Sequence, residues 1–214
     1  MIALIDYSSG NIRSVTKALV REGADVRLVS TPAELEKADA VLLPGVGDFG
    51  DCARGIKSRG LWNPLQDWLG SGKPFFGICV GYQLLFEESE ESPGENGFGF
   101  FKGKVKCFTT PGLKVPQIGW NNLQFTDVAH PLWRGLPPEP YVYFVHSYFP
   151  APEDENVITA RATYGVTFAA GAAKANVAGV QFHPEKSQAT GLTILRNFVT
   201  SVQQSEHSKS AALV

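Results

Sequence analysis

The first half of the chain alternates short, uniformly apolar runs with stretches in which apolar residues recur at helical spacing. The apolar runs cover residues 2–6, 26–29, 40–43 and 74–79, and the helical patterns begin at residues 12, 32 and 80. In the first of these patterns Ile12, Val15 and Leu19 share one face, and Gly23 follows as a stop signal. Runs that are apolar on both faces are typical of parallel strands covered by helices. We therefore predict a three-layer α/β fold with a central, mostly parallel sheet.

Beyond about residue 94 the apolar runs become shorter and alternate with polar residues. They cover residues 100–108, 141–149, 157–162, 166–169 and 177–182, which favours antiparallel or mixed strands on the same core. Residues 187–203 carry one apolar stripe and predict a closing helix. We expect a single domain over residues 1–204 and a loose polar tail over residues 205–214.

Composition narrows the possible partners and compartments. The 214 residues are 43% hydrophobic, and the 19 Lys and Arg against 21 Asp and Glu form no charged block of the kind that binds nucleic acid. The N-terminus lacks the pattern of a signal peptide, and no apolar run reaches membrane-spanning length. The three cysteines are widely spaced without a CxxC. We expect a cytoplasmic protein without disulfides, metal or other cofactor.

One cysteine lies in a motif that carries chemistry. Gly77-Ile78-Cys79-Val80-Gly81 follows an apolar strand and precedes a helix, like a nucleophile elbow with sulfur in place of oxygen. A side chain two residues to either side of such a sharp turn would crowd the neighbouring backbone, and the helix N-terminus favours a thiolate. We interpret Cys52 and Cys107, which lack flanking glycines, as structural residues.

A cysteine nucleophile needs a base, and His183 is the best placed of the four histidines. It follows the apolar run 177–182 and opens His183-Pro184-Glu185, so a carboxylate two residues on can fix its tautomer. Alone, this pattern is also that of an ordinary loop histidine. Backbone donors for an oxyanion are expected from Val80 and from the strand end Pro44-Gly45-Val46-Gly47, which should lie beside the elbow.

Together these residues resemble the class I, triad-type glutamine amidotransferases, with their flavodoxin-like fold. The elbow from Gly77 to Gln83 carries this resemblance. The stretches that carry a closer resemblance to the glutaminase subunits of histidine biosynthesis begin at Asp6, Pro44, Gly119, Tyr143 and Gln181, and the first of them includes Ser9-Gly10-Asn11. The resemblance implies that Cys79 is the nucleophile, His183 its base and Glu185 the residue that orients the base. It also implies a glutamine pocket lined by Gly45, Gly47, Val80 and Gln83. Ser8, Tyr82 and Gln117 depart from the usual family pattern.

The resemblance further implies a protein partner, a (β/α)8-barrel cyclase subunit with which the chain would form heterodimeric imidazole glycerol phosphate synthase. Ammonia would pass to this cyclase by a sealed route, and a peptide of the Gly45–Gly47 strand would turn its oxyanion donor inward when the partner binds. The residues expected at the docking face are Asn11, Trp120, Asn121, Tyr143, His146 and Lys186. Each of them could also be a buried or solvated structural residue.

Three alternatives stay open at this stage. The glutaminase of pyridoxal phosphate synthase shares the triad, but it usually carries Gly-Gly-Glu-Ser where this chain has Pro44-Gly45-Val46-Gly47. A non-catalytic binding module on the same fold would not need an intact triad. A proteolytic cysteine hydrolase would not need Gln83, which points to a small amide substrate.

Overall fold

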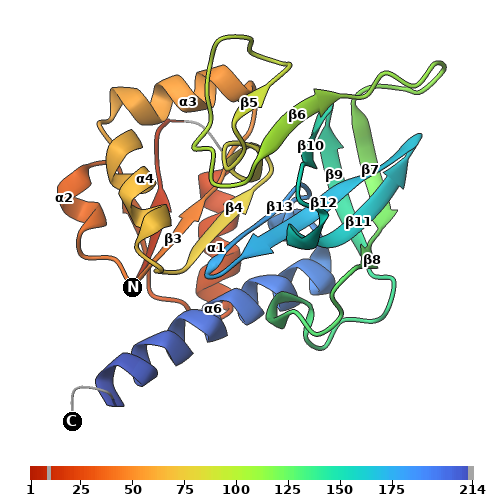
Figure 1. Cartoon of the computed structure of the whole chain (residues 1–214). Helices are drawn as coiled ribbons and strands as arrows, with labels where there is room; N and C mark the ends of the chain where they lie inside the picture. The colour runs from red at the N-terminus through yellow and green to blue at the C-terminus, as the bar shows by residue number, and fades with distance from the viewer. Residues whose placement is uncertain (9–10, 212–214) are drawn as a thin grey trace.

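The computed structural model describes residues 1–8 and 11–211, without the side chains of residues 205–211. Its centre is an eight-stranded sheet in the order β2-β1-β3-β4-β13-β12-β11-β8 (Figure 1). The strands from β2 to β13 pair in parallel, and the other three are antiparallel to their neighbours. The strand bounds are β1 Ile2–Ile5, β2 Val26–Val29, β3 Ala40–Leu43, β4 Phe75–Ile78, β8 Gln124–Phe125, β11 Ile158–Tyr164, β12 Val166–Lys174 and β13 Val177–Val180. The predicted mixed α/β fold with a mostly parallel sheet is confirmed.

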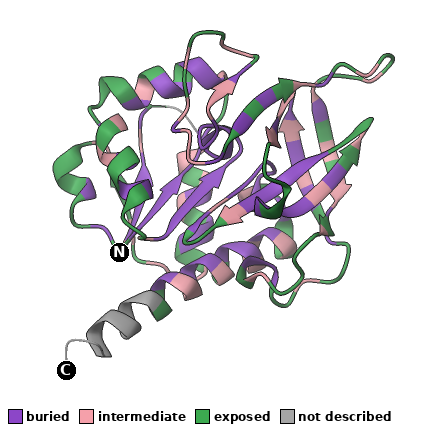
Figure 2. Ribbon diagram, in the orientation of Figure 1, coloured by how far each residue is buried: buried purple, intermediate pink, exposed green. Residues whose placement is uncertain are grey.

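Burial explains why the central strands are so apolar. Every residue of β1, β3 and β4 is buried, because other strands flank them and helices cover them. Strand β2 lies at the edge of the sheet, where Arg27 and Leu28 are exposed. Figure 2 shows this contrast between a buried centre and an exposed periphery.

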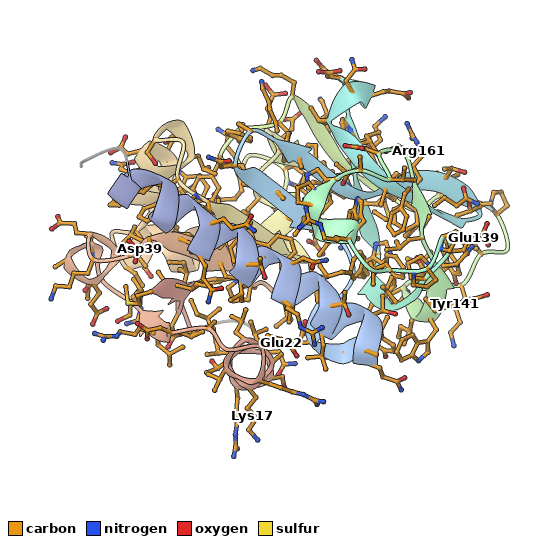
Figure 3. The ribbon with its side chains drawn as sticks, turned by 90° about the horizontal axis from the view of Figure 1, so that it is seen from below. Lys17, Glu22, Asp39, Glu139, Tyr141 and Arg161 are labelled. Atoms are coloured by element: carbon orange, nitrogen blue, oxygen red, sulfur yellow. The ribbon has the colours of Figure 1, made fainter. Side chains whose placement is uncertain are left out.

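Helices cover both faces of the parallel part of the sheet. Helices α3 and α4 lie over one face (Figure 1), whereas α1 and α6 run along the other (Figure 3). Phe198 of α6 stacks on Phe76 of β4 with 5.2 Å between ring centroids, and Arg196 pairs with Glu22 after α1 at 2.7 Å. The helix bounds are α1 Ile12–Arg21, α2 Pro32–Leu35, α3 Phe49–Ser58, α4 Trp62–Gly70, α5 Val80–Gln83 and α6 Gln188–Ala211, with single 3-10 turns η1 Pro131–Trp133, η2 Glu155–Val157 and η3 Pro184–Lys186.

The C-terminal helix is longer than predicted. Helix α6 continues to Ala211, so the segment expected to be a loose tail begins as an extension of the helix. Residues 212–214, like Ser9 and Gly10 of the sequence motif, lie outside the described residues. The division of the chain into a domain and a tail stays a prediction. No helix in the described part of the chain is both long and apolar enough to cross a membrane.

Two small sheets lie beside the central one. The run 141–149, which the sequence suggested was a single strand, is divided between them. The bounds are β5 Glu88–Ser89, β6 Gly103–Cys107, β7 Gln117–Asn122, β9 Tyr141–His146 and β10 Tyr148–Pro152. Strand β9 pairs with β7, whereas β10 pairs with β6. The chain therefore changes sheets at Ser147, and this break lies at the wall of the cavity described below.

Candidate active site

Cys79 occupies a sharp turn between β4 and α5. Its backbone has φ 54° and ψ −111°, a conformation that costs a residue with a side chain of order 1–3 kcal/mol. The flanking glycines make the turn possible. A Cβ atom at Gly77 would lie 2.6 Å from the carbonyl oxygen of Gly81, and one at Gly81 would lie 1.9 Å from that of Leu43. The predicted elbow is therefore present, and both glycines are needed for the reason that the sequence suggested.

The strand end after β3 lies against the elbow, as expected from the neighbouring positions of β3 and β4. A Cβ atom at Gly45 would be 2.6 Å from the amide nitrogen of Gly81 and 2.7 Å from Cβ of Val80. Because Val80 is the first residue of α5, its N–H has no acceptor within the helix. Val80 can therefore offer its N–H to a developing oxyanion, and the Gly45–Gly47 segment is close enough to contribute another.

His183 follows β13 and is held from behind by Glu185. Their Nδ1 and Oε1 atoms are 2.9 Å apart, with only 2% and 1% of the two side chains exposed. Burial lowers the pKa of His183, but the nearby sulfur of Cys79 and the hydrogen-bonded carboxylate of Glu185 outweigh it and raise the pKa to about 10. Nε2 has no hydrogen-bond partner among the described residues and is left for the cavity. This is the arrangement of a base with its orienting carboxylate.

Neighbouring elements fix the loop that carries His183. Its N–H donates to the carbonyl of Tyr143 on β9 at 2.9 Å, and its carbonyl accepts from the hydroxyl of Ser187 at 2.7 Å. Helix α6 crosses close behind this loop at Gly191, where a Cβ atom would lie 1.8 Å from the carbonyl oxygen of Pro184. His183 is thus held in place by a strand, a turn and a helix rather than by a free loop.

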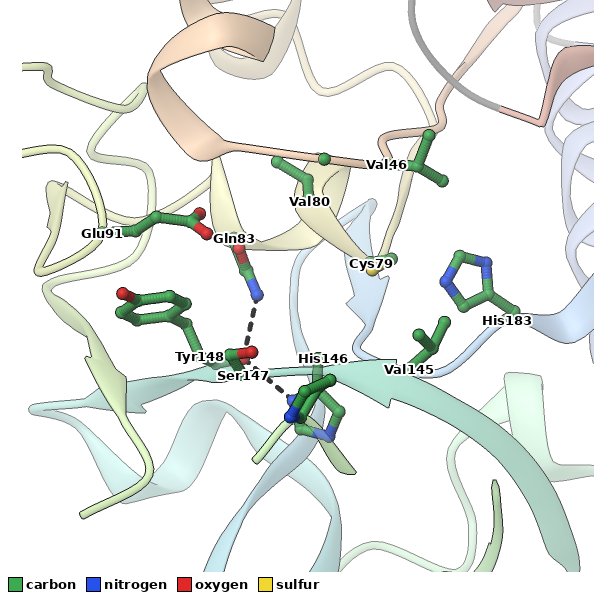
Figure 4. Close-up of a pocket in the computed structure, with 12 residues that line it drawn as sticks. Val46, Cys79, Val80, Gln83, Glu91, Val145, His146, Ser147, Tyr148 and His183 are labelled. Atoms are coloured by element: carbon green, nitrogen blue, oxygen red, sulfur yellow. Dashed lines mark hydrogen bonds between the residues drawn. The ribbon is translucent and has the colours of Figure 1, made fainter. Parts of the chain in front are cut away.

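Cys79 and His183 face one cavity of about 260 Å³ (Figure 4). The lining residues are Val46, Gly47, Cys79, Val80, Gln83, Glu91, Pro116, Val145, His146, Ser147, Tyr148 and His183. Of the four residues predicted to form the glutamine pocket, three line the cavity, and Gly45 packs behind the elbow instead.

The cavity contains residues that the sequence did not single out. Glu91 accepts the N–H of Phe49 at 2.9 Å, and burial together with the charges of Asp48 and Asp51 raises its pKa. Glu91 lies in a polar, acidic stretch that is typical of exposed loops, so no sequence signal marked it. Ser147 and Tyr148 reach the cavity only because the strand breaks between β9 and β10.

His146 was expected at the docking face, but it is buried in the wall of the cavity, so that expectation is corrected. Its side chain lies inside the protein with Nδ1 2.9 Å from the carbonyl of Tyr148 and Nε2 2.9 Å from the amide of Gln117. Burial lowers its pKa to about 4, and the charge of His183 acts in the same direction. A neutral imidazole is therefore built into the wall of the cavity.

Three of the other expected docking residues, Trp120, Tyr143 and Lys186, lie together. Trp120 and Tyr143 are cross-strand neighbours with ring centroids 6.0 Å apart, and Nζ of Lys186 lies 5.9 Å from the Tyr143 ring. Asn121 is partly exposed and donates to the carbonyl of Thr163 at 2.9 Å. Asn11, in contrast, reaches inward and donates to Oε1 of Glu185 at 3.4 Å.

The two other cysteines lie in different surroundings. Cys52 is fully buried in α3, and Cys107 is partly buried at the end of β6. Neither lines the cavity, which agrees with the structural role that the sequence suggested.

A strained cysteine and a carboxylate-oriented histidine facing one cavity are the arrangement expected of a cysteine-dependent acyl-transfer site, and the family comparison points to the same class of enzyme. The family model "Glutamine amidotransferase class-I" matches residues 3–202. Solved structures of a glutamine amidotransferase (TM-score 0.75, 95% of this chain and 100% of the other) and of PurLQS from Thermotoga maritima (0.70, 95% and 97%) share the fold at 19% identity.

Closer relatives define the particular family. The chain is 49% identical to imidazole glycerol phosphate synthase subunit HisH of Microcystis aeruginosa, over 95% of this chain and 97% of the relative. It is 50% identical to the HisH subunit of Thermosynechococcus vestitus, over 94% and 97%. The chain therefore belongs to the HisH family of class-I glutamine amidotransferases. These relatives do not favour the pyridoxal phosphate synthase alternative.

Proposed function

We propose that this chain hydrolyses glutamine to glutamate and ammonia at Cys79 and passes the ammonia to a cyclase subunit, as the glutaminase subunit of imidazole glycerol phosphate synthase. The observation that carries the proposal is the meeting of Cys79 and His183 in one cavity, with Glu185 2.9 Å behind the histidine. Membership of an amidotransferase family whose relatives are subunits of this synthase supports the substrate and the assembly.

The chemistry follows from the roles of these three residues. His183 takes the thiol proton, and the sulfur of Cys79 attacks the amide carbon of glutamine. The resulting oxyanion is stabilised by the N–H of Val80 and by an N–H of the Gly45–Gly47 segment. The imidazolium returns its proton to the departing ammonia, which leaves a γ-glutamyl thioester. Water, deprotonated by neutral His183, then hydrolyses the thioester and releases glutamate.

The far side of the cavity suits the charged end of glutamine. Oε1 of Gln83 is buried and has no hydrogen-bond partner among the described residues, so it is available as an acceptor. Glu91 lies on the same side of the cavity (Figure 4). We assign both to the α-ammonium group, which leaves the amide end of glutamine for Cys79.

The β7–β9 ribbon supports a docking role for the adjacent surface. On one face of this ribbon, Tyr143 lies opposite Trp120, and the next pair in register is Val145 opposite Ile118. Ile118 is 60% exposed and Trp120 47%, whereas Val145 lines the cavity. A partner seated on this face would therefore border the site where ammonia is released. A barrel-shaped cyclase in this position would receive ammonia before it is protonated in water.

The test is to replace Cys79 by alanine in the complex with the cyclase subunit. Glutamine-dependent synthesis should be lost, whereas synthesis from added ammonia should continue, because folding and docking do not need the sulfur. The Cys107→Ala variant is the matched control and should retain both activities. An electrophilic glutamine analogue should label Cys79 and spare Cys52 and Cys107. Glutamine hydrolysis that survives in Cys79→Ala would refute the assignment.

A further inference from the structure

The sulfur of Cys79 has a second polar neighbour besides the base. Gln181 is fully buried, and its Nε2 lies 3.7 Å from Sγ as a hydrogen-bond donor. We propose that Gln181 is a further catalytic residue, which holds the sulfur in place and stabilises its thiolate form by donating this N–H. The inference rests on the proposed role of Cys79 as the nucleophile.

The topology places Gln181 beside Cys79. Strand β13 runs parallel to β4 with Val180 level with Ile78, and the N–H of Cys79 donates to the carbonyl of Val180 at 2.9 Å. Gln181 is the next residue along the chain, and its own N–H is held by the carbonyl of Ala170 at 2.9 Å. The segment after β13 thus provides both the base and a neutral donor, at positions 183 and 181.

A chain of hydrogen bonds sets which end of the Gln181 amide faces the sulfur. The carbonyl of Tyr148 can only accept, so Gln83 must turn its Nε2 toward it, at 3.0 Å. The same Nε2 donates to Oε1 of Gln181 at 3.1 Å. Because Oε1 is held in this way, Nε2 of Gln181 is left for Sγ. The donor orientation is therefore fixed by a backbone group and not by the cysteine itself.

The hydrogen bond from Gln181 stabilises one protonation state of the Cys79 sulfur more than the other. A hydrogen bond to a charged acceptor is stronger than one to a neutral acceptor, so this N–H favours the thiolate over the thiol. A neutral amide takes up no proton near neutral pH and does not compete with His183 for the role of base. If the contact with Sγ served only to satisfy the buried amide of Gln181, removing it would leave the ionisation of the Cys79 thiol unchanged. A catalytic and a purely structural role of Gln181 can therefore be distinguished by measurement.

The experiment follows the pH profile of Cys79 alkylation by iodoacetamide in the full-length chain, with the modified residue identified by mass spectrometry. Gln181→Met removes the donor at nearly constant volume and should move the profile upward by about one pH unit, the value of one charge-assisted hydrogen bond. Gln181→Glu keeps the acceptor for Gln83 but turns an oxygen toward Sγ, so the upward shift should be larger. Gln117→Met, which removes a buried amide that does not touch the sulfur, is the control and should leave the profile in place.

Profiles of both Gln181 variants that coincide with the wild type would overturn the proposal. If neither variant folds, the side-chain ¹⁵N signal of Gln181 in the unmodified chain decides. That signal should follow the titration of Cys79 and lose this pH dependence in Cys79→Ser, and a signal without such dependence would also overturn the proposal. The proposed function is judged separately, by glutamine hydrolysis in the wild-type complex and its loss in Cys79→Ala, because neither result depends on Gln181.

Discussion

Replacing Glu185 by glutamine removes the charge behind His183 at nearly constant size, and so isolates the orienting role of the carboxylate. The two side chains are 1% and 2% exposed and 2.9 Å apart, so water cannot replace the lost charge. A hydrogen bond to a charged group contributes about 1.5–3 kcal/mol, and each 1.4 kcal/mol is a factor of ten in rate. We expect kcat/KM for glutamine to fall about 10- to 150-fold.

Two comparisons make this prediction specific. His183→Ala removes the base itself and should cost more, on the order of 10⁶-fold. The charge of Glu185 is also one of the causes that raise the pKa of His183 to about 10. Without that charge the imidazolium releases its proton more easily, so the alkaline limb of the pH–rate profile should move to lower pH in Glu185→Gln.

The assay measures the initial rate of glutamate formation by the complex with its cyclase subunit and nucleotide substrate, and synthesis from added ammonia checks that each complex is intact. Glu22→Gln is the matched control, because Glu22 pairs with Arg196 at 2.7 Å and its side chain is only 5% exposed, but it does not line the cavity. It should lower the melting temperature and leave kcat/KM unchanged. The orienting role is refuted if Glu185→Gln, still folded, loses as much activity as His183→Ala or keeps the wild-type alkaline limb.

Three further predictions concern the elbow, the pH dependence of stability and the partner. Gly81→Ala places a Cβ atom 1.9 Å from the carbonyl of Leu43, so melting temperature and glutaminase activity should both fall. Gly70→Ala meets nothing within 4 Å and should be neutral or stabilising by about 0.5–1 kcal/mol, and equal melting curves for the two variants would contradict the crowding argument. The pKa of His183 is raised from 6.5 to about 10, so its contribution to stability is fully present below pH 6.5 and is lost as pH rises through about 10. Chemical unfolding across this range should therefore show a steeper loss of stability in the wild type than in His183→Ala, and parallel curves would count against it. The isolated chain should hydrolyse glutamine at least about 10²-fold more slowly than the complex with nucleotide, and equal turnover would identify a free-standing glutaminase.

Much of the fold could be predicted from the sequence because the central strands are buried on both faces. The predicted runs 26–29 and 40–43 coincide with β2 and β3, and α1 ends just before Gly23, which has φ 83°. The strand predicted over residues 166–169 is shorter than β12, which continues through small residues as far as Lys174. Nor did periodicity outline α3, α4 or the ribbon strand β7. Alanine and glycine carry little pattern, so the length of β12 depends on its partners in the sheet.

The site shows the same difference between features that depend on local sequence and features that depend on contacts between distant segments. Cys79, His183 and Glu185 could be proposed as a triad from the sequence because the elbow is a local motif and the carboxylate is two residues from the histidine. The contact of Gln181 with the sulfur and the place of Glu91 in the cavity depend on which strands are neighbours, which no local pattern contains. His146 was assigned to the wrong surroundings for a related reason. In β9 its neighbour Val145 points to the opposite side, and the alternating pattern does not say which side is the interior.

The contacts around the elbow also limit which part of the backbone could move when a partner activates the site. The turn at Cys79 cannot move independently, since Gly77, Gly81 and Gly45 are packed against backbone at 2.6 Å or closer to an added Cβ atom. Gly47 differs, because it has φ 95° and an added Cβ atom there would meet nothing within 4 Å. It also lines the cavity, next to the segment expected to supply an oxyanion donor. If docking reorients a peptide to complete the oxyanion hole, the space and the backbone freedom for that movement are found at Gly47, while the nucleophile stays fixed.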